Sequence, residues 1–212
     1  MSQRAGGSTA FTAVTRRDVN CEASGSTEIS GSTQSAGTNR VSGQSTVLVL
    51  GLGNPLRKDD GVGPRVIEAL EARGLPEGVA ALDGGTGGLD LLRVIERWND
   101  VVIVDAAEVD AGRGLVAPGE FVRFTSKQAQ LSESPHTFSL HHAGLAEALA
   151  LARALDRPLP SIVIFGVQPK DVGWGEGLSP DVEAKLPALV DAVLKEAMGR
   201  VANHTEGRTA RL

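Results

Sequence analysis

The stretch that most constrains this chain runs from residue 47 to residue 63, VLVLGLGNPLRKDDGVG. Its first four residues are apolar, which is typical of a parallel-sheet strand whose two faces are both covered. Gly51 and Gly53 allow a sharp turn and leave room for something to approach the backbone. Asp59 and Asp60 follow near the start of a helix, whose unpaired N–H groups favour a carboxylate. The sequence therefore predicts a strand–loop–helix unit with carboxylates at the strand's carboxyl end, where open α/β sheets bind ligands.

Two nucleotide-binding motifs do not fit this loop. The dinucleotide fingerprint needs a glycine three residues after Gly53, where this chain has Leu56. The phosphate loop needs Ser or Thr after its lysine, but Lys58 is followed by Asp59. Two adjacent acids also repel a phosphate group. The loop therefore favours a cation or a positively charged group as its ligand.

Strands and helices alternate along the rest of the chain, which predicts a three-layer α/β sandwich with a mostly parallel sheet. The segment 119–124 alternates apolar and polar residues and lacks a preceding helix, so we expect it to be an antiparallel strand. The last helix contains Pro187, which predicts a kink or a break. The other expected strands are residues 79–83, 101–105 and 161–167, and the expected helices lie near residues 62–70, 89–98, 142–155 and 180–194.

Composition sets the outer limits of this fold and excludes some classes of protein. The net charge of −5 argues against general nucleic-acid binding, and no apolar run approaches the roughly 20 residues of a membrane helix. Residues 1–45 are rich in Ser, Thr and Gly, so we expect a disordered tail, then a domain at 46–199 and a frayed C-terminus at 200–212. The single cysteine, Cys21, lies in that tail, where no catalytic role is expected, and it fits a cytoplasmic protein.

Three of the predicted strands lead into a carboxylate: Asp60 follows the first, Asp83 ends the second and Asp105 ends the third. Because consecutive strands are usually neighbours, these acids can meet at one edge of the sheet. Each also has a structural explanation. Asp60 could cap its helix, and Asp83 could hold the glycine loop that follows it. For Asp105 such side chain–backbone bonding is the favoured explanation.

Histidines supply the remaining candidate ligands. His136, His141 and His142 lie close together before the fourth helix, whereas His204 is near the C-terminus. Two carboxylates and a histidine suit a divalent metal of intermediate softness and leave coordination positions open. A lone histidine is more often structural or exposed, which is the favoured explanation for His136 and His204.

Taken together, these motifs resemble the hydrogenase maturation protease family over about residues 46–197. The resemblance implies a phosphorylase/hydrolase-like sandwich with a five-stranded mixed sheet flanked by helices. It also implies an endopeptidase that removes a C-terminal extension from the [NiFe]-hydrogenase large-subunit precursor after nickel insertion. The matching segments are GLGNPL with DDGVG at 51–63, LDGGTGG at 82–88, SLHHAGLA at 139–146, FGVQP at 165–169 and LSP at 178–180.

The family's nickel-contacting residues carry over to Asp60, Asp83 and His141, with His136 and His142 as alternatives for the histidine. The metal has two alternative roles. A bound divalent ion can polarise the scissile carbonyl or lower the pKa of a water. In the favoured alternative nickel belongs to the substrate as a recognition element, and Asp60 or Asp83 serves as the general base of an aspartic-type protease. The expected partner is the large-subunit precursor, and the expected state is a cytoplasmic monomer without nucleic-acid or membrane partners. The alternative is a nickel-dependent chaperone that binds the precursor without cutting it.

Overall fold

The computed structural model describes residues 47–109, 116–126, 128, 138–140 and 143–209. The predicted tail at 1–45 lies outside these residues, so that expectation stays a prediction. Three histidines also fall outside the described residues: His136, His141 and His142.

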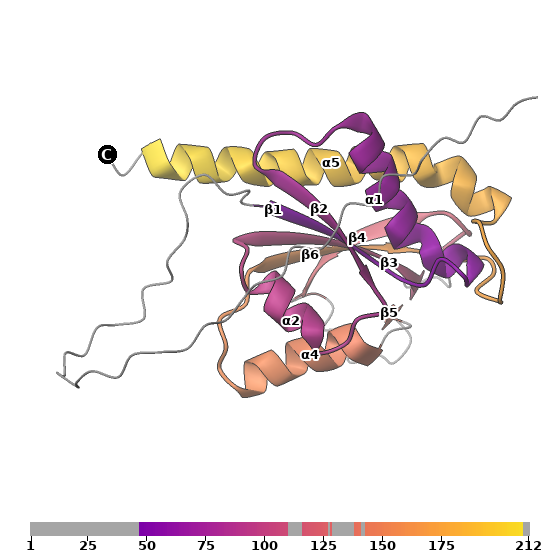
Figure 1. Ribbon diagram of the computed structural model, residues 1–212, viewed down its shortest axis with the longest axis horizontal. Coiled ribbons are helices and arrows are strands. Elements are labelled where there is room, and N and C mark those ends of the chain that lie inside the picture. Colours follow the sequence, from indigo (N-terminus) through magenta and orange to yellow (C-terminus); the bar gives the residue numbers. More distant parts are fainter. Residues whose placement is uncertain (1–46, 110–115, 127, 129–137, 141–142, 210–212) are drawn as a thin grey trace, which may run out of the picture. The chain divides into compact units, whose positions relative to one another are not determined.

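A five-stranded sheet forms the middle layer, as expected (Figure 1). Neighbouring strands are parallel along the path β2–β1–β3–β6, and β4 pairs antiparallel with β6, which confirms the prediction for the alternating segment. In sheet order the strands are β2 (Val79–Gly85), β1 (Val47–Leu52), β3 (Asp100–Val109), β6 (Ser161–Val167) and β4 (Phe121–Thr125). The central strand is β3, which lies between β1 and β6.

One further strand was not predicted from the sequence. The three-residue β5 (Phe138–Leu140) pairs antiparallel with the far end of β3, with Leu140 opposite Ala107. Three residues are too few to show an alternating pattern, so only the pairing with β3 identifies this strand.

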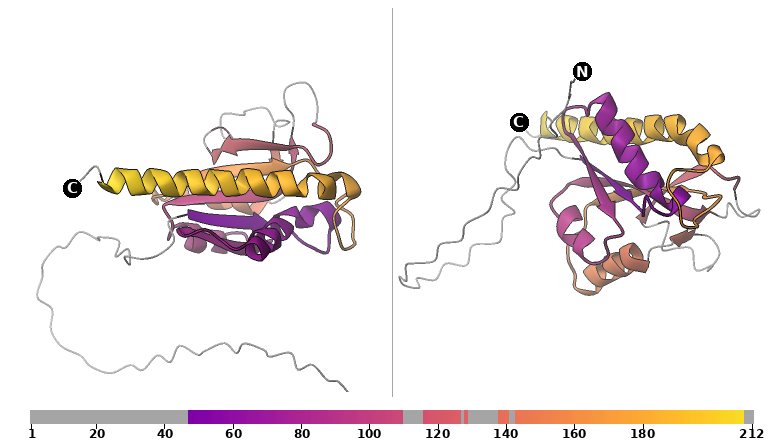
Figure 2. Two further views of the ribbon diagram at one scale, coloured as in Figure 1. Left: turned by 90° about the horizontal axis from the view of Figure 1, so that it is seen from above. Right: turned by 45° about the vertical axis from the view of Figure 1, so that its right-hand side comes forward.

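Helices cover both faces of the sheet, which confirms the three-layer sandwich (Figures 1 and 2). The helices α1 (Val62–Arg73) and α5 (Pro180–Thr209) cover one face, and α2 (Asp90–Ile95) and α4 (Ala143–Ala154) cover the other. Alternate residues of β1 enter the two cores: Val47 and Val49 pack in the first, Leu48 and Leu50 in the second. All four are at most 1% exposed, as an apolar run buried on both faces requires.

Helix α5 corrects two expectations. It continues through Pro187, so the break does not occur and the kink stays a prediction. It also extends past Gly199 to Thr209, where the sequence predicts a frayed end. The extension is stabilised because Arg200 and His204 both pair with the carboxylate of Asp100, which is only 7% exposed. Neither α5 nor any other helix within the described residues is long and apolar enough to cross a membrane.

Candidate active site at the carboxyl edge of the sheet

Glycines pack the turn after β1 tightly against the ends of the strands. A Cβ at Gly63 would lie 2.2 Å from the carbonyl oxygen of Leu52 and 2.7 Å from that of Val104. Gly53 has φ +128°, and a Cβ there would lie 1.7 Å from the carbonyl oxygen of Asp60. These glycines therefore allow segments of the chain's own backbone to pack closely together. They do not leave room for a ligand. The result is a short 3-10 helix, η1 (Lys58–Gly61), held against the end of the sheet.

The first of the two adjacent acids, Asp59, organises a neighbouring loop. Its buried carboxylate accepts four hydrogen bonds from the segment between β6 and α5. The donors are the backbone N–H groups of Lys170 (2.8 Å), Asp171 (3.0 Å) and Ser179 (2.6 Å), and the Ser179 hydroxyl (2.8 Å). With these bonds the carboxylate is fully occupied in holding two loops together, so Asp59 has a structural role.

The second acid, Asp60, is also buried, at 4% exposed, and its Oδ2 accepts a hydrogen bond from the Asn54 N–H at 3.0 Å. It does not cap a helix: neither η1 nor α1 has a side-chain cap, and α1 begins two residues later at Val62. The capping explanation for Asp60 is therefore wrong. Its carboxylate lies buried at the carboxyl end of the sheet, close enough to Asp105 to raise the pKa of that residue.

Asp105 lies on the central strand β3 and is completely buried. Among the described residues neither of its carboxyl oxygens has a hydrogen-bond partner, so the expected loop-holding bond is absent. The pKa of Asp105 is raised from 3.8 to about 7. Burial is the main cause, and the negative charge of Asp60 adds to it. The backbone N–H of Ala106 lowers the pKa of Asp105, although it does not form a hydrogen bond of regular geometry with the carboxyl group. A buried carboxyl group of this kind is found mostly at functional sites.

Asp83, the other predicted acid, has a different environment. Its side chain is exposed, and its Oδ1 accepts a hydrogen bond from the Gly85 N–H at 2.8 Å. This is the loop-holding bond that the structural explanation for Asp83 predicts. The structure therefore brings Asp60 and Asp105 together, while Asp83 lies near the carboxyl end of the edge strand β2 and faces solvent.

The predicted histidine ligand cannot be placed, because His141 lies outside the described residues. The chain is described on both sides of it: Leu140 pairs with Ala107, two residues beyond Asp105, and α4 begins at Ala143. His204 lies elsewhere, against Asp100 at the opposite end of β3. Within the described part of the chain no three His, Cys, Asp or Glu side chains are grouped as metal ligands.

Comparisons with known proteins agree with this architecture. The family model described as hydrogenase maturation protease matches residues 64–196. The chain is 35% identical to the hydrogenase expression/formation protein HupD of Bradyrhizobium diazoefficiens, over 71% of this chain and 77% of that protein. It is 34% identical to the hydrogenase 2 maturation protease of Escherichia coli, over 70% of this chain and 88% of that protein. The solved structure of the hydrogenase maturating endopeptidase HybD from E. coli superposes with a TM-score of 0.58 at 32% identity, covering 74% of this chain and 93% of that one.

Proposed function

Because the chain belongs to the hydrogenase maturation protease family, we propose that it is the endopeptidase that removes the C-terminal extension of a [NiFe]-hydrogenase large-subunit precursor after nickel insertion. The observation that carries the site assignment is the buried pair of Asp60 and Asp105 at the carboxyl edge of the sheet. The E. coli relative is named a maturation protease and the E. coli solved structure a maturating endopeptidase, so a chaperone that binds without cutting is not favoured.

We assign the recognition of substrate nickel to Asp60, Asp83 and His141, with the completely buried Asp105 as a neighbour of Asp60. Two neighbouring carboxylates repel each other unless a proton or a cation lies between them, and Asp105 has no hydrogen-bond donor of its own among the described residues. An arriving divalent ion would supply the missing positive charge. The pairing of Leu140 with β3 supports His141 as the third ligand, because the residue just before it lies beside the strand that carries Asp105.

The sequence predicts Asp83 in place of Asp105 as the second acidic ligand, and that assignment remains testable. Exposure favours Asp83, because its carboxylate can reach a metal ion carried by another protein, whereas Asp105 is completely buried. The Gly85 N–H bonds to one oxygen of Asp83, as the Asn54 N–H bonds to one oxygen of Asp60. Substituting each acid by its amide separates the two assignments, because the amide keeps the size of the side chain and removes its charge.

The cleavage step that we propose is of the aspartic type. With a pKa of about 7, Asp105 can hold or release a proton near neutral pH beside Asp60. The ionised member of the pair accepts a proton from water as the water oxygen bonds to the scissile carbonyl carbon. The C–N bond then breaks, and the departing amine takes a proton from the pair. Two carboxyl groups that share one proton in this way form a general acid and a general base.

Intact-mass measurement of a nickel-loaded precursor, before and after incubation with the protein, tests this function. Loss of the C-terminal extension is the expected result, and the nickel-free precursor should stay uncut. An unchanged mass with the two proteins still associated would instead support the binding-only alternative. The monomeric state and the cytoplasmic location stay predictions, which sedimentation and cell fractionation can check.

A further inference from the structure

Two exposed apolar side chains lie together on the loops next to the site. Trp174 is 77% exposed, more than any other large apolar side chain among the described residues, and Leu56 is 51% exposed. The backbone joins them closely, because the N–H of Gly175, the residue after Trp174, donates to the carbonyl of Leu56 at 2.9 Å. We call these two side chains the Trp174–Leu56 surface.

This surface is rigidly built. The guanidinium of Arg57 lies over the Trp174 ring, 5.8 Å from its centroid, and donates to the carbonyl of Val172 through Nε (3.0 Å) and Nη2 (2.9 Å). The N–H of Lys58 donates to the carbonyl of Gly175 at 2.9 Å. An exposed tryptophan that is already fixed loses little conformational entropy on binding, which is the property of an interface anchor.

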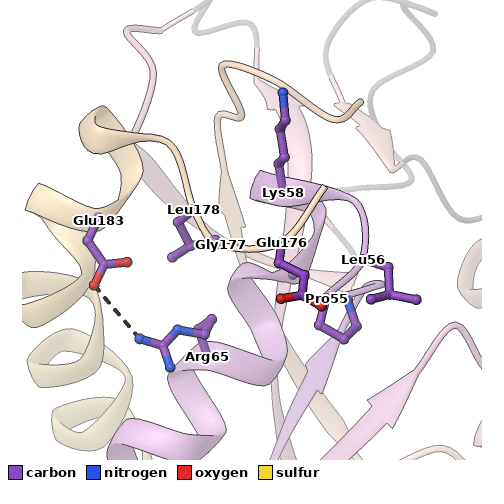
Figure 3. Close-up of a pocket in the computed structure, with 9 residues that line it drawn as sticks. Pro55, Leu56, Lys58, Arg65, Glu176, Gly177, Leu178 and Glu183 are labelled. Carbon is purple, nitrogen blue, oxygen red and sulfur yellow. Dashed lines mark ion pairs between the residues drawn. The ribbon is translucent and has the colours of Figure 1, made fainter. Parts of the chain in front are cut away.

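A cavity of about 320 Å³ adjoins Leu56. Figure 3 shows Pro55 and Leu56 on one side of this cavity, and the Arg65–Glu183 ion pair, with 3.8 Å between charged atoms, on the other. Leu178 also lines it. The surface therefore combines a projecting aromatic ring with a neighbouring hollow that is apolar on one side and charged on the other, an arrangement suited to another folded protein.

Charges around the surface balance each other. The basic side chains nearby are Arg57, Lys58, Arg65 and Lys170, and the acidic ones are Asp171, Glu176, Asp181 and Glu183. Three ion pairs join members of the two groups: Lys58–Asp171, Lys170–Asp181 and Arg65–Glu183. A polar rim without net charge favours binding through apolar burial instead of electrostatic attraction.

We propose that the Trp174–Leu56 surface, with its adjoining cavity, docks an apolar patch on the folded body of the large-subunit precursor. The inference rests on the proposed function, and the construction of the turn supports it. Asp59 holds the loop that carries Trp174, and the next residue, Asp60, belongs to the candidate active site. A partner bound on this surface is thereby held at a fixed distance from the carboxylates, so its C-terminal segment can be presented to them.

Fluorine NMR of the full chain labelled with 5-fluorotryptophan tests the docking directly. The chain has two tryptophans, and Trp98 serves as an internal control because it packs by α2 in the core on the opposite face of the sheet from α1 and α5. On addition of unlabelled nickel-loaded precursor, the Trp174 resonance should shift or broaden while that of Trp98 stays unchanged. A Trp174 resonance that does not respond to a precursor that binds would overturn the proposal.

Processing kinetics provide the second test. Trp174→Ala should raise the KM for the precursor about tenfold or more and leave kcat unchanged, and Trp174→Phe should restore much of the loss. The matched control is Leu155→Ala, since Leu155 is equally apolar and 59% exposed at the end of α4. Raising the salt concentration should change the KM little, because the rim carries no net charge.

The outcomes separate the two proposals. Unchanged KM for Trp174→Ala, with normal cleavage, would reject the docking surface and leave the protease assignment standing. A Trp174 resonance that responds to a precursor that is never cut would reject the protease assignment and keep the docking surface. If sedimentation shows that the chain dimerises, and that Trp174→Ala abolishes the dimer, the occupant is a second copy and the proposal is wrong.

Discussion

The carboxylate of Asp59 accepts hydrogen bonds from both the backbone N–H and the hydroxyl of Ser179, a residue 120 positions further along the chain. This contact joins the turn after β1 to the start of α5. The adjacent Asp60 contributes its charge to the other side of the same turn, towards Asp105. The two neighbouring acids thus have different roles: Asp59 holds the loops together, and Asp60 faces the candidate site.

Asp59→Ala should destabilise the fold strongly. It leaves the partly buried N–H groups of Lys170, Asp171 and Ser179 without their acceptor, and we expect a cost of about 3 kcal/mol in the free energy of unfolding. Urea unfolding measures this cost. As a control, Asp191→Ala removes an acid from an exposed ion pair with Arg73 and should cost far less. Equal costs for the two variants would contradict the role given to Asp59.

Asp105→Asn should stabilise the fold at alkaline pH. The pKa of Asp105 is raised in the folded state, from 3.8 to about 7, so wild-type stability falls as pH rises between those two values. A shift of about three units sets an upper limit of about 4 kcal/mol, and we expect the variant to gain ~1–3 kcal/mol at about pH 8.

That gain should shrink towards zero near pH 4, where the folded wild type is already protonated at Asp105. Urea unfolding of both proteins across this pH range gives the measurement. The control is Asp83→Asn, which changes an exposed carboxylate. If the difference in unfolding free energy between wild type and Asp105→Asn is the same at every pH, the carboxyl group is not held in a buried, charged environment.

Gly63→Ala and Gly199→Ala should have opposite effects. At Gly63 the added methyl group meets backbone atoms of Leu52 at 2.2 and 2.5 Å, so α1 must move away from the sheet, at a cost of about 3 kcal/mol or more. At Gly199, inside α5, nothing lies within 4 Å, so alanine should stabilise the helix by ~0.5–1 kcal/mol. Thermal unfolding compares the two, and a tolerated Gly63→Ala would contradict the packing of the turn.

Arg200→Ala should show that the end of α5 belongs to the fold. It removes a partner from Asp100, a carboxylate that is only 7% exposed, and we expect a cost of about 2–3 kcal/mol. The exposed Arg73, which pairs with Asp191, provides the control, and Arg73→Ala should cost below ~1 kcal/mol. If Arg200→Ala costs no more than the control, the last turns of α5 contribute little to stability.

The fold could be predicted from the sequence because apolar patterns report burial. The run at 47–50 predicted a strand buried on both faces, and the alternation at 119–124 predicted an antiparallel one. Two elements escaped this reasoning: β5, which is too short to show a pattern, and the last turns of α5. Those turns depend on Asp100, a residue about 100 positions earlier, which local sequence cannot reveal.

The candidate site was only half predictable. The sequence predicts that Asp83 and Asp105 each end a strand, whereas β2 and β3 continue past them to Gly85 and Val109. The sequence also does not give the order of the strands. In the folded sheet β2 is an edge strand, so Asp83 reaches solvent, whereas β3 is central, so Asp105 is enclosed beside Asp60. In the sequence, Asp105 is an acid that follows four apolar residues. This pattern is compatible with a site residue and also with a loop-holding residue. Only the tertiary arrangement separates the two.

The most direct test of this account compares Asp105→Asn with Asp83→Asn, by intact mass of a nickel-loaded large-subunit precursor incubated with each variant. Both substitutions remove one carboxylate and keep its size, and urea unfolding first verifies that both variants are folded. The account predicts that Asp83→Asn leaves the precursor at full mass, because it removes a proposed contact to nickel, and that Asp105→Asn slows processing, because it changes the buried neighbour of Asp60. Normal processing by both variants would contradict the assignment of the active site to this edge of the sheet.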